Sequence, residues 1–521
     1  MPFPALPADR RRVACYHPSP MPGPQRILPT PVTVVLVATA AAALLSIACG
    51  AGTPEGGAGG RAAAANGGRR PNILLLTVDT LRPDHLGCLG YPRRTSPHID
   101  ALARRGVIFR QAITAAGRTV QSFPSILTGV YPPVHGLRHE GQDSGILEGR
   151  LTLTRVLRDN GYDAFAVTQG LNVGLHRDFE IYDPDIYIGP DGEKVYRPSR
   201  DDRDASVKAI AWLRSRRGNQ RPFFLWMRYD APHWPYAAPP PYGEMFDPGY
   251  TGPHTFNAGQ KPEPRRGDMI FGMTRLPPRE VEHAVAHYDG EVAFSDQAIG
   301  DLMKAIDAMG ETARTVVVVT ADHGEGLGEH NYFFEHGAYL YEPIVRVPLI
   351  VTAPGLLPEG RVIAPVTRTI DIMPTLLDLA GIPVPEGLQG RSLVPLARGE
   401  DHGPAPPAYC ESGRNYFKEN PRQFIEGTAG KWRMMRDDRF KLILIPRDPE
   451  PIWEFYDLVA DPGETTNVID RFPDDVARLR SALLAIVAGD PGRDDRDEPP
   501  LNDDLEERLR SLGYVGGGDR P

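Results

Sequence analysis

Two acidic positions, each placed just beyond a short apolar run, are the first candidates for chemistry in this sequence. Asp79 follows the run 72–78, and Asp322 with His323 comes just after the run 316–320. Short, continuously apolar runs are typical of parallel strands that are covered on both faces. Because ligands bind beyond the carboxyl ends of such strands, we expect the three side chains to converge. Two carboxylates and one imidazole form a site for a divalent ion, and this ligand set is compatible with Mn²⁺ or Zn²⁺.

Between these two positions lies a hydroxyl-rich segment that is able to supply a nucleophile. Residues 117–129 carry Thr119 and Ser122 near their start, become apolar and end at Gly129. We predict a short helix that starts near Ser122. Its first amide groups would face an anion, and a hydroxyl in its first turn would reach the metal and be activated. The alternatives are structural: a Ser or Thr cap, an Asp79 cap and a turn at Asp322.

The elements that must position these residues alternate between strand and helix. Helices are predicted at 101–105, 153–160, 205–214 and 299–309, and further strands at 163–167, 223–227 and 347–352. This alternation predicts an α/β fold with a large doubly wound, mostly parallel sheet flanked by helices. After about residue 400, a hairpin at 432–436 and 439–444 and a helix along 476–487 indicate a smaller α+β subdomain.

The N-terminus is predicted to direct export. Four arginines precede the apolar run 32–48, which ends at Cys49, so residues 1–49 are interpreted as a secretory signal. The stretch 45–49 approximates a bacterial lipoprotein cleavage site, and the alternative is an uncleaved membrane anchor. We therefore expect the protein to lie in the periplasm or to be attached to the cell envelope through a lipid anchor. The Gly/Ala-rich residues 50–70 form a flexible linker, followed by a catalytic domain at 71–400 and the C-terminal subdomain at 401–521.

Composition narrows the class of function. The chain is 24% charged with a formal net charge of -9, which leaves no basic surface for nucleic acid. Of the four cysteines, only Cys88 and Cys410 remain once residues 1–49 are removed, so no disulfide framework is expected.

Several motifs, taken in order, resemble those of the sulfatase family within the alkaline phosphatase superfamily. The resemblance covers nearly all of residues 71–515. The motifs are Asn72-Ile-Leu-Leu-Leu-Thr-Val-Asp79, Ser96-Pro-His-Ile-Asp-Ala-Leu-Ala103, Leu127-Thr-Gly-Val-Tyr-Pro132, Ala231-Pro-His-Trp-Pro235, Thr320-Ala-Asp-His-Gly-Glu-Gly-Leu-Gly328, Arg346-Val-Pro-Leu-Ile350 and Phe455-Tyr-Asp-Leu458. The resemblance implies an alkaline-phosphatase-like fold and an ester hydrolase.

Carried over by position, the resemblance implies the following roles. Asp79, Asp322 and His323 are metal ligands, and Thr80 stands where many family members have a second aspartate ligand. The implied cofactor is one divalent ion, Ca²⁺ by resemblance. A second ion would need ligands such as Asp289, Asp296, His330 or His336. The implied substrate contacts are His233 at the leaving or bridging oxygen, then His336, and more loosely His135 with Arg138.

The nucleophile departs from the family pattern. Family sulfatases convert a cysteine to formylglycine, and gapless counting back from residues 127–129 places Thr119 at that position and Ser122 at the motif serine. An alternative register aligns 122–125 with the motif. No cysteine is present in either register, so formylglycine cannot form. A threonine ester must be resolved by water, which favours phosphoryl chemistry.

Three functions follow from these features. The first is a metal-dependent hydrolase that cleaves a sulfate ester of a glycan, lipid or small molecule outside the cytoplasm. The second is a phosphodiesterase, phosphonate esterase or phosphotransferase that uses a threonine nucleophile. The third is an inactive protein that binds anions, and retention of Asp79, Asp322 and His323 argues against it.

Overall fold

A computed structural model describes most of the chain beyond the linker. The described residues are 69–138, 149–169, 171, 174–183, 186–188, 194–196, 201–253, 276–400, 403–413, 430–447 and 449–489. All of them belong to one compact unit, Gly56–Pro521. The predicted signal and nearly all of the predicted linker lie outside the described residues. No helix in the described part is long and apolar enough to cross a bilayer.

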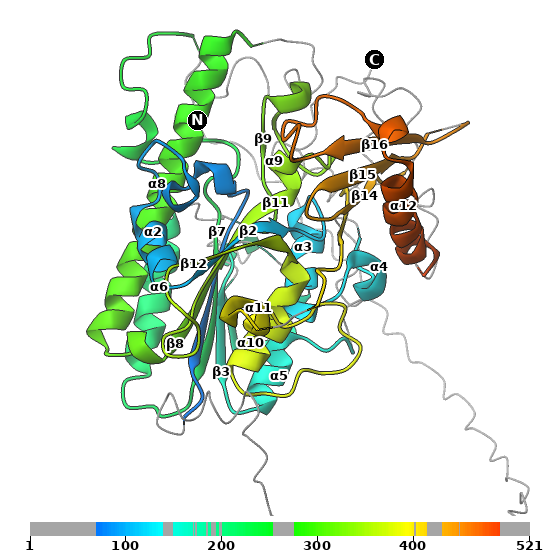
Figure 1. The fold of residues 1–521 in the computed structure, drawn as a ribbon. Helices are drawn as coiled ribbons and strands as arrows, with labels where there is room; N and C mark the ends of the chain where they lie inside the picture. The colour runs from blue at the N-terminus through cyan, green and yellow to red at the C-terminus, as the bar shows by residue number, and fades with distance from the viewer. Residues whose placement is uncertain are drawn as a thin grey trace, which may run out of the picture. The chain divides into compact units, whose positions relative to one another are not determined.

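An eight-stranded sheet forms the centre of the fold, in the order β12-β2-β11-β8-β1-β7-β3-β4 (Figure 1). Only β11 runs antiparallel to its neighbours, so the sheet is mixed but mostly parallel. The predicted fold class is confirmed. In chain order, the strands are β1 (Asn72–Val78), β2 (Val107–Ile113), β3 (Asp163–Val167), β4 (Ile181–Asp183), β7 (Phe223–Tyr229), β8 (Thr315–Thr320), β11 (Arg346–Thr352) and β12 (Arg361–Arg368).

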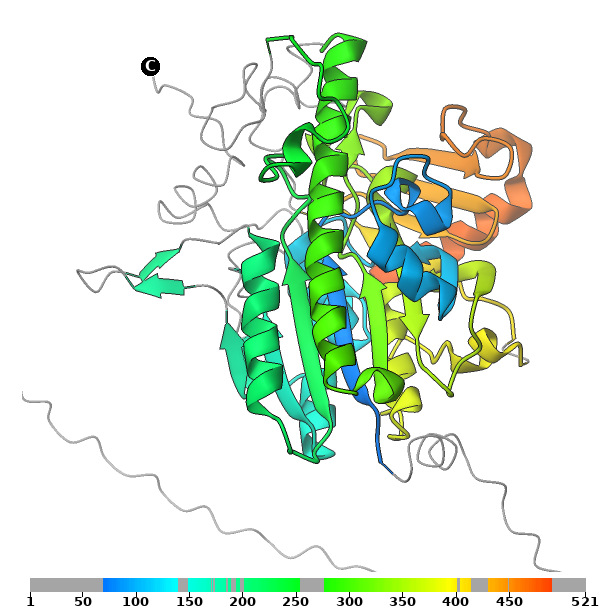
Figure 2. The ribbon, with the colours of Figure 1, turned by 90° about the vertical axis from the view of Figure 1, so that its left-hand side faces the viewer.

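Helices cover both faces of this sheet, as a doubly wound architecture requires. Figure 2 shows α6 and the long α8 lying across one face, and Figure 1 shows α3, α5, α10 and α11 on the other side of the strands. On the first face are α2 (Pro97–Arg104), α6 (Asp202–Ser215) and α8 (Pro278–Ala308); on the second are α3 (Thr119–Thr128), α5 (Leu153–Asp159), α10 (Ile372–Leu379) and α11 (Val394–Arg398). With both faces covered, every residue of β1 and β8 is buried.

Four predicted helices have different boundaries in the structure. Helix α2 starts four residues before the predicted start at 101, and α6 starts three residues before the predicted start at 205. Helix α8 spans 31 residues, and the predicted helix at 299–309 is only its last third. Its first two thirds bury His283, Asp289 and Asp296, so polar residues interrupt the apolar periodicity there. Helix α3 starts at Thr119, three residues before the predicted start. The first hydrogen bond of its backbone runs from Ser122 N to Arg118 O, 3.0 Å, which places Thr119 in the first turn.

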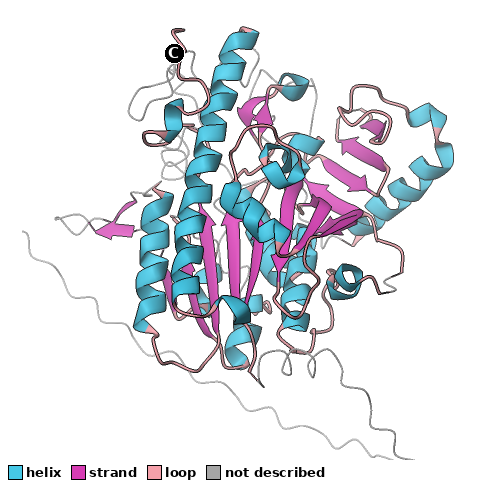
Figure 3. Ribbon diagram, turned by 60° about the vertical axis from the view of Figure 1, so that its left-hand side comes forward, coloured by secondary structure: helices cyan, strands magenta, loops and turns pink. Residues whose placement is uncertain are grey.

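The C-terminal subdomain is a four-stranded antiparallel sheet in the order β13-β14-β15-β16 with α12 packed on it (Figure 3). Leu479 and Leu483 of α12 pack with Phe440 and Phe455 of the sheet. Its elements are β13 (Ala408–Glu411), β14 (Arg433–Arg436), β15 (Phe440–Ile445), β16 (Ile452–Asp457) and α12 (Pro473–Ala488). The predicted hairpin and helix are both present. Short elements elsewhere are α4 (Pro132–His135), β5 (Ile186–Ile188), β6 (Lys194–Tyr196), β9 (Gly326–Leu327), β10 (Phe333–Glu335) and α9 (Glu342–Val345).

Candidate active site

Three predicted site residues meet at the carboxyl ends of two adjacent strands. Strands β1 and β8 pair in parallel with Thr77 opposite Thr320, so Asp79 and Asp322 each lie two residues beyond that pair. Nε2 of His323 is 3.4 Å from Oδ2 of Asp322 and 3.8 Å from Oδ1 of Asp79. The candidate ligand atoms of Asp79, Asp322 and His323 all lie within 4.8 Å of one another. Strand register alone is therefore sufficient to build the cluster.

The donor atoms of this cluster fit a cation. Oδ1 of Asp79 and Oδ2 of Asp322 are buried and have no hydrogen-bond partner among the described residues. The other Asp322 oxygen, Oδ1, accepts from the backbone N–H of His323 at 3.0 Å. The Nδ1 of His323 is 2.9 Å from the carbonyl oxygen of Gly324, which assigns the proton to Nδ1 and directs the Nε2 lone pair toward the carboxylates. Buried carboxylate oxygens without a partner are costly unless a cation or a proton joins them.

The charges of the cluster also favour binding of a cation. Burial, and then the negative charge of Asp322, raise the pKa of Asp79 above its ordinary value. The guanidinium of Arg228 donates to Oδ2 of Asp79 and, at 2.9 Å, to Oδ1 of Asp230. Burial alone would lower the pKa of Arg228, but the charges of Asp79, Asp230 and Asp322 outweigh it and raise that pKa.

Thr80 lies beside the cluster in a strained conformation. Its φ is +54°, a region that β-branched residues rarely adopt. Its backbone N–H donates to Oδ1 of Asp322 at 3.4 Å, and its buried hydroxyl has no hydrogen-bond partner within the described part of the chain. A strained backbone conformation of this kind persists only where contacts with the surrounding structure hold it in place. The turn places a hydroxyl beside Asp322 that is able to join a metal site.

The two candidate nucleophiles have different environments. Oγ1 of Thr119 is 3.1 Å from Nε2 of His323, and the residue is half-buried. Ser122 is fully buried; its Oγ is 2.7 Å from the carbonyl oxygen of Ala116 and 3.0 Å from Oγ1 of Thr114. The structure therefore places Thr119, and not Ser122, against the acidic cluster.

Two further histidines border the cluster. The ring of His336 stacks on His323 with the centroids 4.2 Å apart, and its Nδ1 is 3.2 Å from Oε1 of Glu325. The ring of His233 meets His336 edge to face at 5.2 Å, and its Nδ1 is 2.7 Å from the carbonyl oxygen of Trp234. In both rings Nδ1 faces a protein oxygen, so Nε2 would be the nitrogen that exchanges a proton with a substrate.

His135 is bonded within its own segment. Its Nε2 is 3.0 Å from Oγ of Ser125, and its Nδ1 accepts from the backbone N–H of Leu137 at 3.1 Å. Burial lowers the pKa of His135 to about 3, so the ring is neutral. Arg138 forms an ion pair with Glu411 of β13 at 2.9 Å. These contacts join the segment after α3 to the C-terminal sheet.

Three residues considered for a second ion have other partners. Asp289 accepts from Nδ1 of His85, the Tyr91 hydroxyl and the Arg93 guanidinium at 2.5 to 2.7 Å. Asp296 accepts from two backbone N–H groups in the first turn of α2. His330 stacks on Tyr341 with the centroids 3.6 Å apart. None of the three belongs to the cluster around Asp322.

Sequence analysis did not identify Arg228 and Glu325 as site residues. Arg228 is the only charged residue of β7 and interrupts an apolar run in a strand that is buried throughout. A charge in such a strand is a usable signal, since buried arginines need partners. Glu325 follows Asp322-His323-Gly324 directly, and only the structure shows that it contacts His336.

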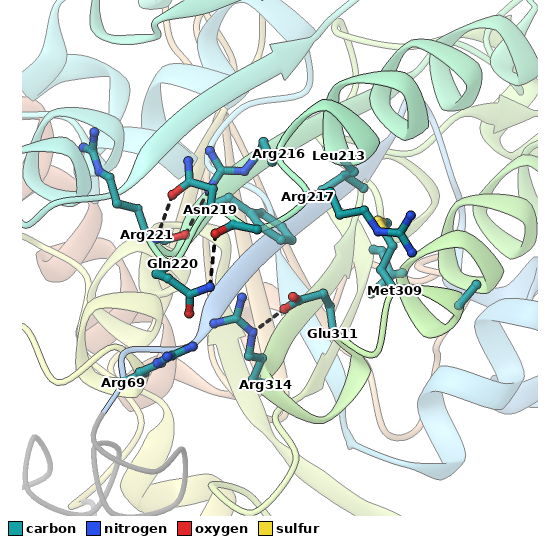
Figure 4. A pocket seen from close by; sticks show the side chains of 14 residues that line it. Arg69, Leu213, Arg216, Arg217, Asn219, Gln220, Arg221, Met309, Glu311 and Arg314 are labelled. Carbon is teal, nitrogen blue, oxygen red and sulfur yellow. Dashed lines mark hydrogen bonds and ion pairs between the residues drawn. The ribbon is translucent and has the colours of Figure 1, made fainter.

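A cavity of about 250 Å³ lies at the opposite end of the sheet, among arginines (Figure 4). Arg216 pairs there with Asp163, and Arg314 pairs with Glu311. Helices α6 and α8 end at this cavity, and positive side chains stabilise the C-terminal ends of helices. Because the seven residues of β1 span about 23 Å, this cavity is remote from Asp79 and forms no part of the site.

The fold and the cluster together define an α/β protein with a candidate metal site at the carboxyl ends of its parallel strands. The Sulfatase family model matches residues 71–382, and the model described as N-sulphoglucosamine sulphohydrolase, C-terminal, matches residues 328–485. The chain therefore belongs to the sulfatase family and is an ester hydrolase.

Similar proteins agree with this assignment. An N-acetylglucosamine-6-O-sulfatase of Bacteroides thetaiotaomicron is 24% identical over 80% of this chain and 86% of its own length. An arylsulfatase of Clostridium perfringens is 28% identical over 81% of this chain and 95% of its own. The solved phosphonate monoester hydrolase of Agrobacterium radiobacter shares the fold, with a TM-score of 0.64, 22% identity and coverage of 80% of this chain and 96% of its own.

Proposed function

We propose that this chain is a metal-dependent hydrolase that cleaves a sulfate ester outside the cytoplasm, with Thr119 as its nucleophile. The observation that carries the proposal is the convergence of one hydroxyl, two carboxylates and one imidazole at a single buried point. Oγ1 of Thr119 lies 3.1 Å from Nε2 of His323, which in turn lies within 3.8 Å of both carboxylates. A purely structural polar cluster would not leave two of its carboxylate oxygens without a partner.

Oδ1 of Asp79, Oδ2 of Asp322 and Nε2 of His323 would hold one divalent ion, with the hydroxyl of Thr80 nearby. A bound ion would lower the pKa of the Thr119 hydroxyl and offset the negative charge on the transferred group. The nitrogen ligand favours Mn²⁺ or Zn²⁺, whereas the family resemblance favours Ca²⁺.

The chain's own residues account for the remaining steps. Thr119 gives its hydroxyl proton to solvent, and its Oγ1 forms a bond to sulfur while the bond from sulfur to the alcohol oxygen breaks. The departing oxygen takes a proton from Nε2 of His336, which Glu325 orients, or from His233. Water then attacks sulfur and returns a proton to the same histidine, while the bond from sulfur to Oγ1 of Thr119 breaks. Sulfate leaves, and the Thr119 oxygen regains its proton from solvent.

A second candidate function is hydrolysis of a phosphate diester or a phosphonate ester at the same site. The identity of the nucleophile favours it. A formylglycine hydrate has a second hydroxyl that can expel sulfate, whereas an ester on Thr119 must be opened by water at sulfur or phosphorus.

The substrate is an anionic ester, and the N-acetylglucosamine-6-O-sulfatase relative supports a sulfated sugar as its class. The predicted secretory signal at residues 1–49 supports export, and the similarity of residues 45–49 to a lipoprotein cleavage site supports attachment to the cell envelope through Cys49. Inactive anion binding is disfavoured, because it requires neither a hydroxyl beside His323 nor an oriented His336.

A substrate panel tests the proposal. Metal-free protein is supplied with Mn²⁺, Zn²⁺ or Ca²⁺ and assayed on aryl sulfate, aryl phosphate, bis-aryl phosphate and aryl phosphonate. The fastest turnover on aryl sulfate supports the first function, and the fastest turnover on a phosphorus ester supports the second. Absence of turnover with every ion and substrate contradicts both.

A further inference from the structure

The cavity at the amino end of β1 carries a concentrated positive charge. It has a volume of about 250 Å³ and lies at the end of the sheet opposite to Asp79 (Figure 4). Among the described residues, the charged ones that line it are five arginines and one glutamate: Arg69, Arg216, Arg217, Arg221, Arg314 and Glu311. The whole chain has a formal net charge of -9, so this group of arginines is opposite in sign to the protein that carries it.

Two carboxylates offset only part of this charge. Oδ2 of Asp163 accepts from Arg216, and its Oδ1 lies 2.9 Å from Nη1 of Arg221. Glu311 accepts from Nε of Arg314. The C-terminal ends of α6 and α8 add about half a negative charge each. Five arginines exceed these negative charges by about two, so the stabilisation of two helix ends does not account for all of them.

Three arginines keep hydrogen-bond donors that no protein group uses. Nη1 of Arg314 is buried and has no acceptor in the described part of the chain. The side chains of Arg69 and Arg217 form no hydrogen bond or ion pair with other described residues. Figure 4 shows Arg69, Gln220 and Arg314 at the same end of the cavity. A buried donor without an acceptor is costly, and a phosphate group supplies acceptors that match the planar guanidinium.

The position of the cavity relates it to the predicted anchor. Arg69 is the first described residue, and 20 residues separate it from Cys49. A chain of that length reaches at most about 70 Å, so an anchor at Cys49 would keep this end of the fold within reach of a membrane. Figure 2 shows the beginning of β1 and the C-terminal ends of α6 and α8 at this same end of the sheet. The active site lies at the other end of β1, about 23 Å away.

We propose that this arginine cavity binds the phosphate group of an anionic phospholipid, so that the enzyme rests on the membrane with its active site facing away from it. The inference goes beyond the hydrolase activity and rests on the proposed envelope attachment. The tether brings lipid phosphates to the cavity directly. A sulfated glycan is disfavoured as the occupant, because a glycan held here would lie about 23 Å from the cluster at Asp79.

The test measures backbone hydrogen exchange of the full-length protein on lipid vesicles. One set of vesicles contains phosphatidylcholine alone, and the other includes about a third phosphatidylglycerol. Inorganic phosphate and soluble dextran sulfate replace the vesicles in two further arms. We expect the amides of residues 216–221 to exchange about tenfold more slowly on anionic than on neutral vesicles, since each basic residue at an anionic surface strengthens binding about fivefold. Residues 322–325 should exchange equally on both.

Two cavity variants and one control locate the effect. Arg69→Glu and Arg314→Gln should reduce the difference between the two kinds of vesicle to about twofold or less. Arg110→Glu is the matched control, because Arg110 is an exposed arginine of β2 that lies outside the cavity and has no ion pair among the described residues. It should keep the tenfold difference. All three variants should hydrolyse a small aryl ester as the wild type does.

Equal exchange of residues 216–221 on both kinds of vesicle overturns the inference, and so does an unchanged difference in Arg69→Glu. Protection by phosphate or dextran sulfate without protection by anionic vesicles also overturns it. If Arg314→Gln does not fold, the exposed position Arg69 decides. The proposed envelope attachment fails separately: mass spectrometry that finds no lipid on Cys49 would contradict the anchor, and slower exchange on anionic vesicles would still support the cavity.

Discussion

The hydroxyl oxygen of Thr119 lies 3.1 Å from Nε2 of His323, although 204 residues separate them in the chain. The contact depends on where α3 begins. With Thr119 in the first turn, its side chain faces the ends of β1 and β8, whereas Ser122 turns back to the carbonyl oxygen of Ala116. The same helix thus carries one hydroxyl for the cluster and one that supports the segment before the helix.

We predict that Thr119→Val abolishes turnover, with a loss of at least about a thousandfold, because it removes the only hydroxyl in contact with His323 in the described structure. The ion should remain bound, since Asp79, Asp322 and His323 are unchanged. Stopped assays combined with metal analysis measure both effects.

Ser122→Ala is the paired control. It should keep turnover within about threefold and lower the free energy of unfolding by about 1 kcal/mol, through loss of the hydrogen bond to Ala116. The reverse pattern, with inactive Ser122→Ala and active Thr119→Val, would assign the nucleophile to Ser122.

His336 and Glu325 are predicted to act as a unit. Nδ1 of His336 is 3.2 Å from Oε1 of Glu325, so Glu325 fixes the ring that transfers the proton. His336→Asn should lower kcat by about a hundredfold or more, within the range of lost acid–base catalysis. The loss should be smallest for substrates with good leaving groups, which need little protonation.

Glu325→Gln keeps a hydrogen-bonding side chain and should therefore lose less kcat than His336→Asn. A double variant should be no worse than His336→Asn alone. Additive losses, measured as kcat across a series of aryl esters, would show that the two residues act independently.

Five of the eight strands of the central sheet were predicted from sequence, whereas β2, β4 and β12, and the starts of helices α2, α3, α6 and α8, were not. The runs at 72–78 and 316–320 contain no charged residue, and both are strands in the structure. The start of α3 was misplaced, because its first turn contains Thr119-Val-Gln121, which carries no capping signal and little periodicity. The long α8 was truncated because its first part buries polar residues such as His283 and Asp289.

The meeting of Asp79 with Asp322 followed from a rule about strand ends, so it could be predicted from sequence and is present in the structure. The contacts of Arg228 could not be predicted. They depend on the order of strands in the sheet, which places β7 between β1 and β3, and sequence patterns do not specify that order. The separate roles of Thr119 and Ser122 likewise required the exact start of a helix.

A buried carboxylic acid behind the site predicts an unusual dependence of stability on pH. Burial raises the pKa of Asp202 to about 7. Oδ2 of Asp202 is 2.5 Å from Oγ of Ser295, which also donates to the carbonyl oxygen of Ala231 at 2.9 Å. A protonated Asp202 satisfies this arrangement, because the single Ser295 proton is already used.

For an acid with a raised pKa, the folded state binds the proton more tightly than the unfolded state. The contribution of Asp202 is therefore present at low pH and is lost as pH rises from about 4 to about 7. Asp202→Asn should remove this loss and raise the free energy of unfolding at pH 8 by up to about 4 kcal/mol. Urea denaturation at pH 5 and pH 8 tests it, with exposed Asp301→Asn as the control. Equal effects of Asp202→Asn at both pH values would show that Asp202 is ionised throughout.

His135 is predicted to be structural, and its pH dependence has the opposite sign. Burial lowers its pKa to about 3 from an ordinary 6.5, so the folded state favours the neutral ring. Its contribution to stability is fully present above pH 6.5 and is lost as pH falls toward 3, at up to about 1.4 kcal/mol per pH unit. His135→Asn keeps an acceptor for the Leu137 N–H but loses the contact with Ser125.

This variant should be less stable at pH 7 by about 1–3 kcal/mol and should lose less stability between pH 6.5 and 4.5 than the wild type. Its kcat should change by less than about threefold, because His135 bonds to Ser125 and Leu137 and not to the cluster at Asp322. Denaturation curves at three pH values, together with initial rates, separate the two roles. A hundredfold fall in kcat with unchanged stability would show that His135 contacts the substrate, as the family resemblance implies.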